Sequence, residues 1–386
     1  MKTLSTTAEL KSYCDYAATF DYVTVDTEFL REKTYYSKLC LVQLAVPDFD
    51  NDDAAVLVDP LASDLDLEPL YDLFRDTNTV KVFHAARQDL EIFWQMGQVF
   101  PDPLFDTQVA AMVCGFGDQV GYETLVRKVA KENMDKSSRF TDWSRRPLTS
   151  AQMNYAIGDV THLRVIYEFL AKELVKTKRD HWVAEELEIL TDSATYDISP
   201  ADAWKRVKVR SSSRRFLASV QALAEFRENH AQTRNVPRNR VFKDDALSEI
   251  ASSNPKSMED LSRMRLLLRE ARKGDIASGI LAAVAKVRKA DPETYPKPAK
   301  KREGPTVNPA LADLLRVLLK AKCEEFKVAQ KLIASAADLD HLASGERDLA
   351  FLKGWRADVF GKDAIKLCEG QAALTLTGRH IKMIAV

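Results

Sequence analysis

The apolar residues among the first hundred positions fall into short runs that predict β-strands. Residues 22–29, 39–45 and 55–59 are rich in Val and Leu and are separated by polar turns, a spacing typical of an antiparallel meander. Residues 80–84 form a fourth run, which residues 85–95 continue as a helix. Three strands followed by a strand and a helix predict a mixed sheet covered by helices.

Further along the chain, apolar residues recur mostly at helical spacing. A long helix is predicted from about residue 150 to residue 172, with Thr149 or Ser150 as its N-cap. From residue 214 onward an apolar stripe again has helical period, at Phe216, Leu217, Val220, Leu223 and Phe226. The end of the chain, residues 374–386, is richer in β-branched residues and departs from an all-helical pattern.

These patterns divide the chain into parts. Residues 291–309 contain five prolines and the run Lys300-Lys301-Arg302, and we expect a linker there. The expected parts are a mixed-sheet unit at 1–175, a connector at 176–210, a helical unit at 211–290, the linker at 291–309 and a second helical unit at 310–386.

Composition narrows the class of protein. The chain has 386 residues, 46% of them hydrophobic and 29% charged, as in an ordinary globular protein of two or three domains. The net charge is -1, so any contact with nucleic acid depends on local positive charge. Five scattered cysteines without a C-x-x-C pair argue against a zinc site and a disulfide framework. No signal-peptide core and no membrane-length apolar run are present, so we expect a cytoplasmic protein without a membrane partner.

The first candidate site is a pair of acids in the first strand. Asp26 and Glu28 are two residues apart, so both point to the same face, opposite Val23 and Val25. Two carboxylates side by side at the end of a buried strand repel each other unless a divalent cation lies between them. The pair therefore predicts half of a metal site; the alternative is an exposed strand end with solvated acids.

The second candidate lies where the fourth strand gives way to a helix. Asp89 is near the start of that helix and could face the strand edge that carries Asp26. The alternative is an ordinary acid in a first helical turn, which the helix dipole favours. His84, at the strand end, is expected either to contact a phosphate or sugar or to be a core histidine.

The third candidate lies on the long helix. Tyr155 and Asp159 are four residues apart, so both face one side. Gly158 costs about 1 kcal/mol relative to Ala in a helix interior, and we expect it to let the helix pack close to the sheet. The alternative for Tyr155 is a half-buried tyrosine without a special role.

Just before that helix, residues 135–146 interleave cations with aromatic rings. Lys136 and Arg139 precede Trp143, and Arg145 and Arg146 follow it. Cations combined with aromatics are typical of a groove for single-stranded nucleic acid. The alternative is an irregular loop packed by Trp143. Phe29, which follows the first pair of acids, is a further candidate substrate contact.

Read in order, the patterns D-x-E, H-A-x-x-x-D-L and Y-x-x-x-D form a specific set. They resemble the three exonuclease motifs of the DEDD superfamily, and the Tyr four residues before the last Asp is similar to its DEDDy branch. The stretches D-T-E-F and T-Y-Y after residue 25, and D-K-S and T-D-W after residue 134, resemble the ribonuclease D family. The helical units resemble HRDC domains, the second less closely, so the resemblance covers nearly the whole chain.

The resemblance implies a ribonuclease-H-like exonuclease domain followed by two small all-helical HRDC-like bundles. It implies hydrolysis of RNA from the 3′ end, release of nucleoside 5′-monophosphates, and a role in tRNA 3′ maturation. Carried over to this chain, Asp26, Glu28, Asp89 and Asp159 are the metal ligands and Tyr155 positions the water. HRDC domains imply contact with nucleic acid through basic residues, here Arg210, Arg214, Arg215, Arg234, Arg238 and Arg240; the alternative is an ordinary solvated surface.

The chemistry agrees with that implication. Two metal ions roughly 4 Å apart can hold both the attacking and the leaving oxygen of a phosphodiester. Ligands that are all oxygens favour Mg²⁺ or Mn²⁺. We expect Asp26 to bridge the two ions, Glu28 and Asp159 to complete one of them and Asp89 to lie nearer the other. A tyrosine with a pKa near 10 is a poor base, so Tyr155 is expected to orient the water.

Two other functions compete with an RNA exonuclease. A DNA 3′ exonuclease of the same superfamily would carry the same motifs, because the choice of sugar depends on contacts with the 2′-hydroxyl. A catalytically dead RNA-binding adaptor would lack a ligand, but all four acids and the tyrosine are present. We expect a monomer that acts on RNA, especially tRNA precursors with 3′ extensions. Deletion of residues 210–386 is expected to weaken binding of structured RNA and to spare cleavage of short oligonucleotides.

Overall fold

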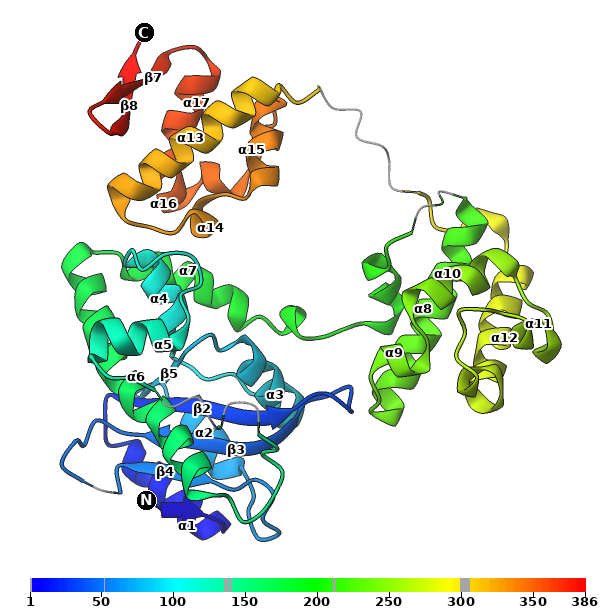
Figure 1. The fold of residues 1–386 in the computed structure, drawn as a ribbon, viewed down its shortest axis with the longest axis horizontal. Helices are drawn as coiled ribbons and strands as arrows, with labels where there is room; N and C mark the ends of the chain where they lie inside the picture. The colour runs from blue at the N-terminus through cyan, green and yellow to red at the C-terminus, as the bar shows by residue number, and fades with distance from the viewer. Residues whose placement is uncertain are drawn as a thin grey trace.

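The computed structural model describes residues 2–51, 53–134, 138, 141–209, 211, 213–298 and 306–386. Figure 1 shows an N-terminal unit built around a sheet, a helical unit drawn in green to yellow, and a C-terminal unit drawn in orange to red. No helix in the described ranges is both long and apolar enough to cross a membrane.

The N-terminal unit is built on one six-stranded sheet. Its strands are β1 (Lys2–Leu4), β2 (Tyr22–Leu30), β3 (Lys38–Ala45), β4 (Ala55–Val58), β5 (Val80–Phe83) and β6 (Leu104–Asp106), in the order β1-β4-β3-β2-β5-β6. β2, β3 and β4 are antiparallel neighbours, so the predicted meander is confirmed. β5 is parallel to β2, and the parallel pairs of β1 with β4 and β6 with β5 complete the mixed sheet. β1 and β6 have only three residues each, which is too short for a strand period to be read from the sequence.

Helices cover both faces of this sheet. They are α1 (Thr7–Ala17), α2 (Glu68–Arg75), α3 (Arg87–Gly97), α4 (Thr107–Val113), α5 (Tyr122–Leu125), the π-turn η1 (Val126–Ala130), α6 (Ser150–Thr177) and α7 (Asp180–Leu190). One core, which includes Val23 and Val25, lies between the sheet and α1, α2 and α3. The other face carries α6: the Thr24 hydroxyl donates to the Val160 carbonyl over 2.8 Å. Asp26 has the same strand parity as Thr24 and therefore faces α6.

The helix that carries the third motif begins as predicted and runs further. Thr149 is its N-cap and forms a capping box with Gln152, while its C-terminal end lies at Thr177. The expectation that Gly158 lets α6 approach the sheet is wrong. A Cβ at Gly158 would have only the His162 ring of the same helix within 4 Å, at 3.9 Å.

The first helical unit has its own core. Its elements are η2 (Ser193–Thr195), η3 (Pro200–Arg206), α8 (Arg214–Arg234), α9 (Arg238–Val241), α10 (Asp244–Ser253), α11 (Met258–Ser262), η4 (Glu270–Arg272), α12 (Gly274–Lys289) and η5 (Pro292–Thr294). Leu223, Leu247 and Ile280 are fully buried in a cluster whose fully buried members all lie between residues 203 and 284.

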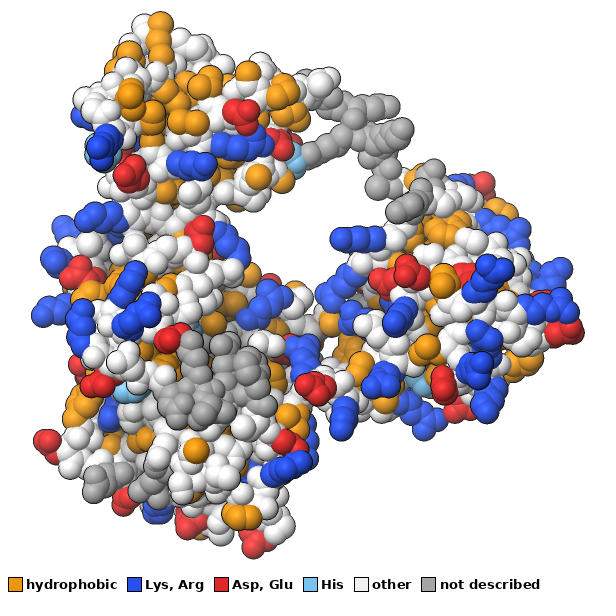
Figure 2. All heavy atoms as spheres, in the orientation of Figure 1, with side chains coloured by type: hydrophobic (Ala, Val, Ile, Leu, Met, Phe, Trp, Pro, Cys, Tyr) orange, Lys and Arg blue, Asp and Glu red, His pale blue; other side chains and the backbone are white. Residues whose placement is uncertain are grey.

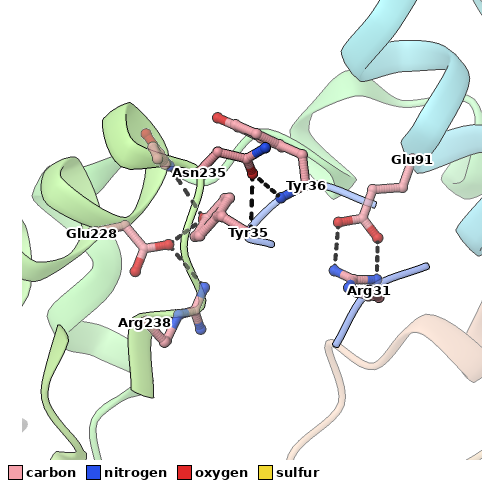
Figure 3. A network of polar contacts seen from close by, with 8 residues as sticks. Arg31, Tyr35, Tyr36, Glu91, Glu228, Asn235 and Arg238 are labelled. Atoms are coloured by element: carbon pink, nitrogen blue, oxygen red, sulfur yellow. Dashed lines mark hydrogen bonds and ion pairs between the residues drawn. The ribbon is translucent and has the colours of Figure 1, made fainter. Parts of the chain in front are cut away.

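A polar contact joins this helical unit to the loop between β2 and β3 (Figure 3). The Asn235 side-chain oxygen accepts from the main-chain N–H groups of Tyr35 and Tyr36, each over 3.0 Å. The Tyr35 hydroxyl donates to the Glu228 carboxylate, which Arg238 also contacts at 2.8 Å. The Glu228 side chain is only 2% exposed, so these two partners stabilise a buried charge at the contact.

The C-terminal unit comprises α13 (Pro309–Phe326), α14 (Gln330–Ile333), α15 (Ala336–Ala343), η6 (Ala350–Leu352), α16 (Gly354–Arg356), the π-turn η7 (Ala357–Gly361), α17 (Lys362–Cys368), β7 (Ala372–Thr377) and β8 (His380–Ala385). The last two strands form an antiparallel hairpin. The expectation of an all-helical bundle is therefore wrong at this end, where the β-branched residues already departed from the helical pattern.

The C-terminal unit shares a hydrophobic core with the N-terminal unit. One cluster of buried side chains joins Val113 and Leu125 of the N-terminal unit to Leu315 and Phe360 of the C-terminal unit. The Ala329 N–H donates to the Met112 carbonyl over 2.9 Å. A deletion that begins at residue 210 would expose this core, which argues against the expectation that it spares cleavage of short substrates.

Candidate active site

The three sequence motifs meet around one cavity on the α6 face of the sheet. The cavity has a volume of about 260 Å³ and is lined by Asp26, His84, Gly121, Tyr122, Glu123, Thr124, Met134, Tyr155, Asp159 and Leu163. These residues come from β2, from the position after β5, from α5 and α6, and from the loops that contain Gly121 and Met134. Tyr155 and Asp159 both line it, as their spacing of four predicts.

Asp26 and Asp159 lie close enough for their negative charges to repel each other. Asp159 is 6% exposed, while Asp26 is partly accessible from the cavity. Burial and the neighbouring charge of Asp159 raise the pKa of Asp26 well above its usual range, although a hydrogen bond with the Thr27 backbone opposes the shift. A cation between the two carboxylates would relieve this repulsion.

Asp89 approaches the same strand from the other face. It is the third residue of α3, is 6% exposed, and accepts a hydrogen bond from the Thr27 hydroxyl. Burial, followed by the charge of Asp26, raises its pKa well above its usual range. It is thus not an ordinary solvated acid of a first helical turn. β5 pairs with β2 only over Tyr22–Thr24, so the next part of β2 is open to the start of α3.

Glu28 does not line the cavity that Asp26 and Asp159 share. It is partly exposed beside a β-bulge between Glu28 and Phe29. In the ranges that the structure covers, no three His, Cys, Asp or Glu side chains converge tightly enough to form a ready-made metal site. The donors are all carboxylate oxygens, which suit Mg²⁺ or Mn²⁺. To hold an ion jointly, the carboxylates of Asp26, Asp89, Asp159 and Glu28 would have to move closer together.

Trp143 lies beneath Tyr155 and does not line an open groove. It is 2% exposed and packs with Cys40, Leu41 and Ala156, and its ring centroid lies 6.1 Å from that of Tyr155. A groove in which Trp143 contacts the nucleic acid would need an accessible ring, and in this structure the ring is covered. Trp143 instead supports the ring of Tyr155, so the alternative of a loop packed by Trp143 describes this residue.

The other expected substrate contacts have different outcomes. His84 lines the cavity, and its Nδ1 lies 2.9 Å from the Thr107 hydroxyl. Burial lowers the pKa of His84, which favours the neutral ring and suits a sugar hydroxyl better than a charge contact with phosphate. Phe29 is partly buried against the core under α1 to α3. Lys136 and Arg139 lie outside the described residues.

Within the described part of the chain, most of the arginines that were expected to contact phosphate already bind an acidic side chain. Arg146 forms a two-point contact with Asp59, with both N–O distances 2.7 Å. Arg214, Arg234 and Arg238 contact Glu293, Asp275 and Glu228, respectively. Arg215 and Arg240 show no side-chain ion pair or hydrogen bond within the described residues, while Arg210 lies outside them. Figure 2 shows many Lys and Arg side chains over the visible face of the first helical unit.

Sequence reasoning missed two residues that shape the cavity. Asp106 accepts from the N–H groups of Ala85 and Ala86 at 3.0 and 2.8 Å and also caps α4, so it fixes the turn after His84. An Asp before an apolar helical run is a readable capping signal. Tyr122 lines the cavity and donates its hydroxyl to the Asp159 carbonyl. No local pattern distinguishes it from other tyrosines.

Comparisons with known proteins identify two domains and full-length relatives of this chain. Residues 1–175 match the family model described as 3'-5' exonuclease, and residues 216–284 match the HRDC domain. The chain is 61% identical over 384 residues to a ribonuclease D of Jannaschia sp. (strain CCS1), covering 100% of this chain and 99% of that one. It is 46% identical over 385 residues to a ribonuclease D of Nitrobacter hamburgensis, covering 99% of both.

A solved structure gives the same result for the fold. The crystal structure of Escherichia coli RNase D, titled an exoribonuclease involved in structured RNA processing, matches with a TM-score of 0.82 at 28% identity. The match covers 96% of this chain and 98% of that chain. The expected fold class is confirmed, apart from the C-terminal hairpin. The chain therefore belongs to the ribonuclease D family and is a hydrolytic 3′→5′ exoribonuclease with an HRDC domain.

Proposed function

We propose that this exoribonuclease trims 3′ extensions of tRNA precursors and other RNAs in the cytoplasm, as a monomer, and releases nucleoside 5′-monophosphates. The observation that carries the proposal is the convergence of Asp26, Tyr155 and Asp159 on one cavity, with Asp89 buried beside the same strand. The relatives are ribonuclease D proteins over nearly their full length, which supports RNA as the substrate.

The proposed metal ligands are Asp26, Glu28, Asp89 and Asp159, for two ions of Mg²⁺ or Mn²⁺. When bound, such ions supply an activated water and stabilise the leaving oxygen. The protein contributes the carboxylates, of which those of Asp89 and Asp159 are buried. Asp26 lies close enough to both Asp159 and Asp89 for their charges to interact, so it would contribute to holding both ions.

Tyr155 is proposed to orient the attacking water. It lies one helical turn before Asp159 on the cavity wall, and the buried Trp143 ring supports its position. A neutral phenol can donate to or accept from a water without removing its proton, which suits an orienting role. His84, which also lines the cavity, is proposed to contact the sugar of the terminal nucleotide.

The remaining proposed contacts lie outside the cavity. Lys136 and Arg139 are proposed to hold the phosphates of the strand that leads to the 3′ end, and Phe29 to border its path. We propose residues 1–175 as the catalytic domain, 211–290 and 310–386 as HRDC-like domains, and 176–210 and 291–309 as the segments between them. Arg215 and Arg240 on the first HRDC-like domain remain candidates for phosphate contact.

The test is a hydrolysis assay with the purified full-length chain. A tRNA with a 3′ extension, a matched single-stranded RNA and a matched DNA are incubated with Mg²⁺ or Mn²⁺ and again with EDTA. We expect stepwise shortening of the RNAs, release of 5′-monophosphates, and complete loss of activity with EDTA and in Asp159→Asn. Equal rates on DNA would instead indicate a DNA exonuclease, and activity in EDTA would refute the metal assignment.

A further inference from the structure

Tyr122 lines the cavity and contacts α6, the helix that carries Tyr155 and Asp159. It is the first residue of α5, its ring centroid lies 5.2 Å from that of His84, and its hydroxyl donates to the main-chain carbonyl of Asp159. Burial, followed by the charges of Asp159 and Asp26, raises the pKa of Tyr122 well above its usual range. The phenol therefore keeps its proton and acts as a donor.

The contact fixes the backbone of a proposed metal ligand. The Asp159 carbonyl lies inside α6, where one lone pair accepts the N–H of the residue four positions on. A carbonyl oxygen has a second lone pair, and the Tyr122 hydroxyl uses it. This second donor restrains α6 at Asp159, whose carboxylate faces Asp26.

The residues next to Tyr122 in the chain pack into the hydrophobic core that the N-terminal and C-terminal units share. Val120, Leu125 and Val126, which flank Tyr122, are buried in the cluster that continues into the C-terminal unit. On its other side, the Tyr122 ring packs against a cluster that contains Leu163 of α6. Tyr122 is therefore held at both its backbone and its ring, which is what a side chain that restrains another residue requires.

We propose that Tyr122 is a positioning residue that holds Asp159 in place for metal binding. The inference rests on the proposed metal role of Asp159. Loss of a hydrogen-bond partner that orients a metal ligand typically weakens metal affinity by about 10- to 100-fold. Because α6 keeps its own hydrogen bond at Asp159, removal of the Tyr122 hydroxyl should act on metal affinity and leave the fold intact.

The experiment measures Mn²⁺ binding to the full-length protein directly, through the electron paramagnetic resonance signal of free Mn²⁺. The variants are Tyr122→Phe, Asp159→Asn and the matched control Tyr13→Phe. Tyr13 is also buried and also donates its hydroxyl to a main-chain carbonyl, that of Ala54 over 2.7 Å, but it lies in the core under α1 to α3. Thermal unfolding is recorded for every variant.

We expect Tyr122→Phe to bind Mn²⁺ about 10-fold more weakly than wild type, and Tyr13→Phe to bind it normally. 4-Aminophenylalanine placed at position 122 keeps a donor and should restore much of the affinity. Normal Mn²⁺ binding by Tyr122→Phe, or equal losses in both tyrosine variants, would overturn the inference. Should Tyr122→Phe fail to fold, normal folding with wild-type affinity in the amino variant would support it, and weak binding there would refute it.

The Asp159→Asn variant separates this inference from the proposed function. If Asp159→Asn binds Mn²⁺ as well as wild type, the proposed metal site itself is wrong. If Asp159→Asn loses binding while Tyr122→Phe does not, the metal site stands and the inference about Tyr122 is wrong.

Discussion

Replacement of Trp355 by Ala tests whether the C-terminal unit is an integral part of the nuclease. Trp355 is 5% exposed and stacks on Trp182 of α7, with ring centroids 4.2 Å apart and planes 10° apart. Its neighbour Arg356 contacts Glu185 and Glu186, which lie in α7 with Trp182. The substitution removes this ring stacking and keeps all three ion-pairing side chains, although Arg356 loses the ring over which its guanidinium lies.

The size of the effect follows from packing. Replacing a buried Trp with Ala costs about 3–5 kcal/mol, because the transfer free energy of the ring is lost and a cavity remains. The Trp355 Nε1 has no hydrogen-bond partner in the described residues, so the loss comes from packing and from the Arg356 guanidinium, which lies over the ring at 4.5 Å from its centroid. At about 2–4 °C per kcal/mol for a unit of this size, the unfolding midpoint should fall by roughly 6–20 °C.

Calorimetry of the full-length protein is the assay, with Trp204→Ala as the control. Trp204 is a half-buried tryptophan that packs on the core of the first helical unit, which is separate from the shared core. We expect Trp355→Ala to lower the transition in which the sheet unit and the C-terminal unit unfold together. Trp204→Ala should lower the stability of the first helical unit alone.

The variant should also lose activity on short oligonucleotides, because the shared core supports the cavity wall that carries Tyr122. The reasoning would be refuted if Trp355→Ala produced a separate early transition of the C-terminal unit, with the transition of the sheet unit and the cleavage of short oligonucleotides unchanged. That result would mean that the two units do not stabilise each other.

Three further predictions concern the site and the contact between units. Tyr155→Phe should lower the single-turnover rate by about 100-fold or more with little change in RNA affinity, because the water loses its orienting hydroxyl; a change in affinity alone would contradict this role. The pKa of Asp26 is higher in the native state than in the unfolded chain, so the stability of the metal-free protein should rise as pH falls through that raised pKa. Asp26→Asn should therefore be more stable than wild type in EDTA at mildly alkaline pH and lose that advantage at acidic pH, as denaturant unfolding would show; identical pH dependence would argue against the assigned repulsion. Tyr35→Phe should weaken docking of the first helical unit by about 1–3 kcal/mol, because the Glu228 carboxylate loses a donor, and single-molecule energy transfer between the units should show broader distances. Tyr36→Phe is the control, since Tyr36 makes its contact with Asn235 through the main chain, and equal broadening in both variants would speak against the hydroxyl contact.

Much of the sheet could be predicted from the sequence because strand patterns are local. The alternation at Val23, Thr24, Val25 and Asp26 fixes which side chains share a face, and the structure places them accordingly. The spacing of Tyr155 and Asp159 on one helix likewise places both on the cavity. These relations depend on backbone geometry over a few residues, which the sequence specifies directly.

The interpretation of residues 135–146 shows where local reasoning fails. Trp143 follows a run of polar and charged residues, which is compatible with a surface groove, yet its ring is buried under Tyr155. Arg146 is a residue type that commonly contacts phosphate, but here it is bound to Asp59, which is 87 residues away in the chain. Whether a cation or an aromatic ring is free depends on partners that are distant in sequence.

The sequence by itself determined the order of the motifs, the face on which each acid lies and the family to which they are similar. Only the tertiary structure decided which of these side chains meet. Asp89 reaches β2 because the pairing of β5 stops at Thr24, and Tyr122 reaches Asp159 because a core shared with the C-terminal unit holds α5 in place. Local periodicity sets the direction of a side chain, whereas distances between segments follow from sheet order and from the packing of complete units.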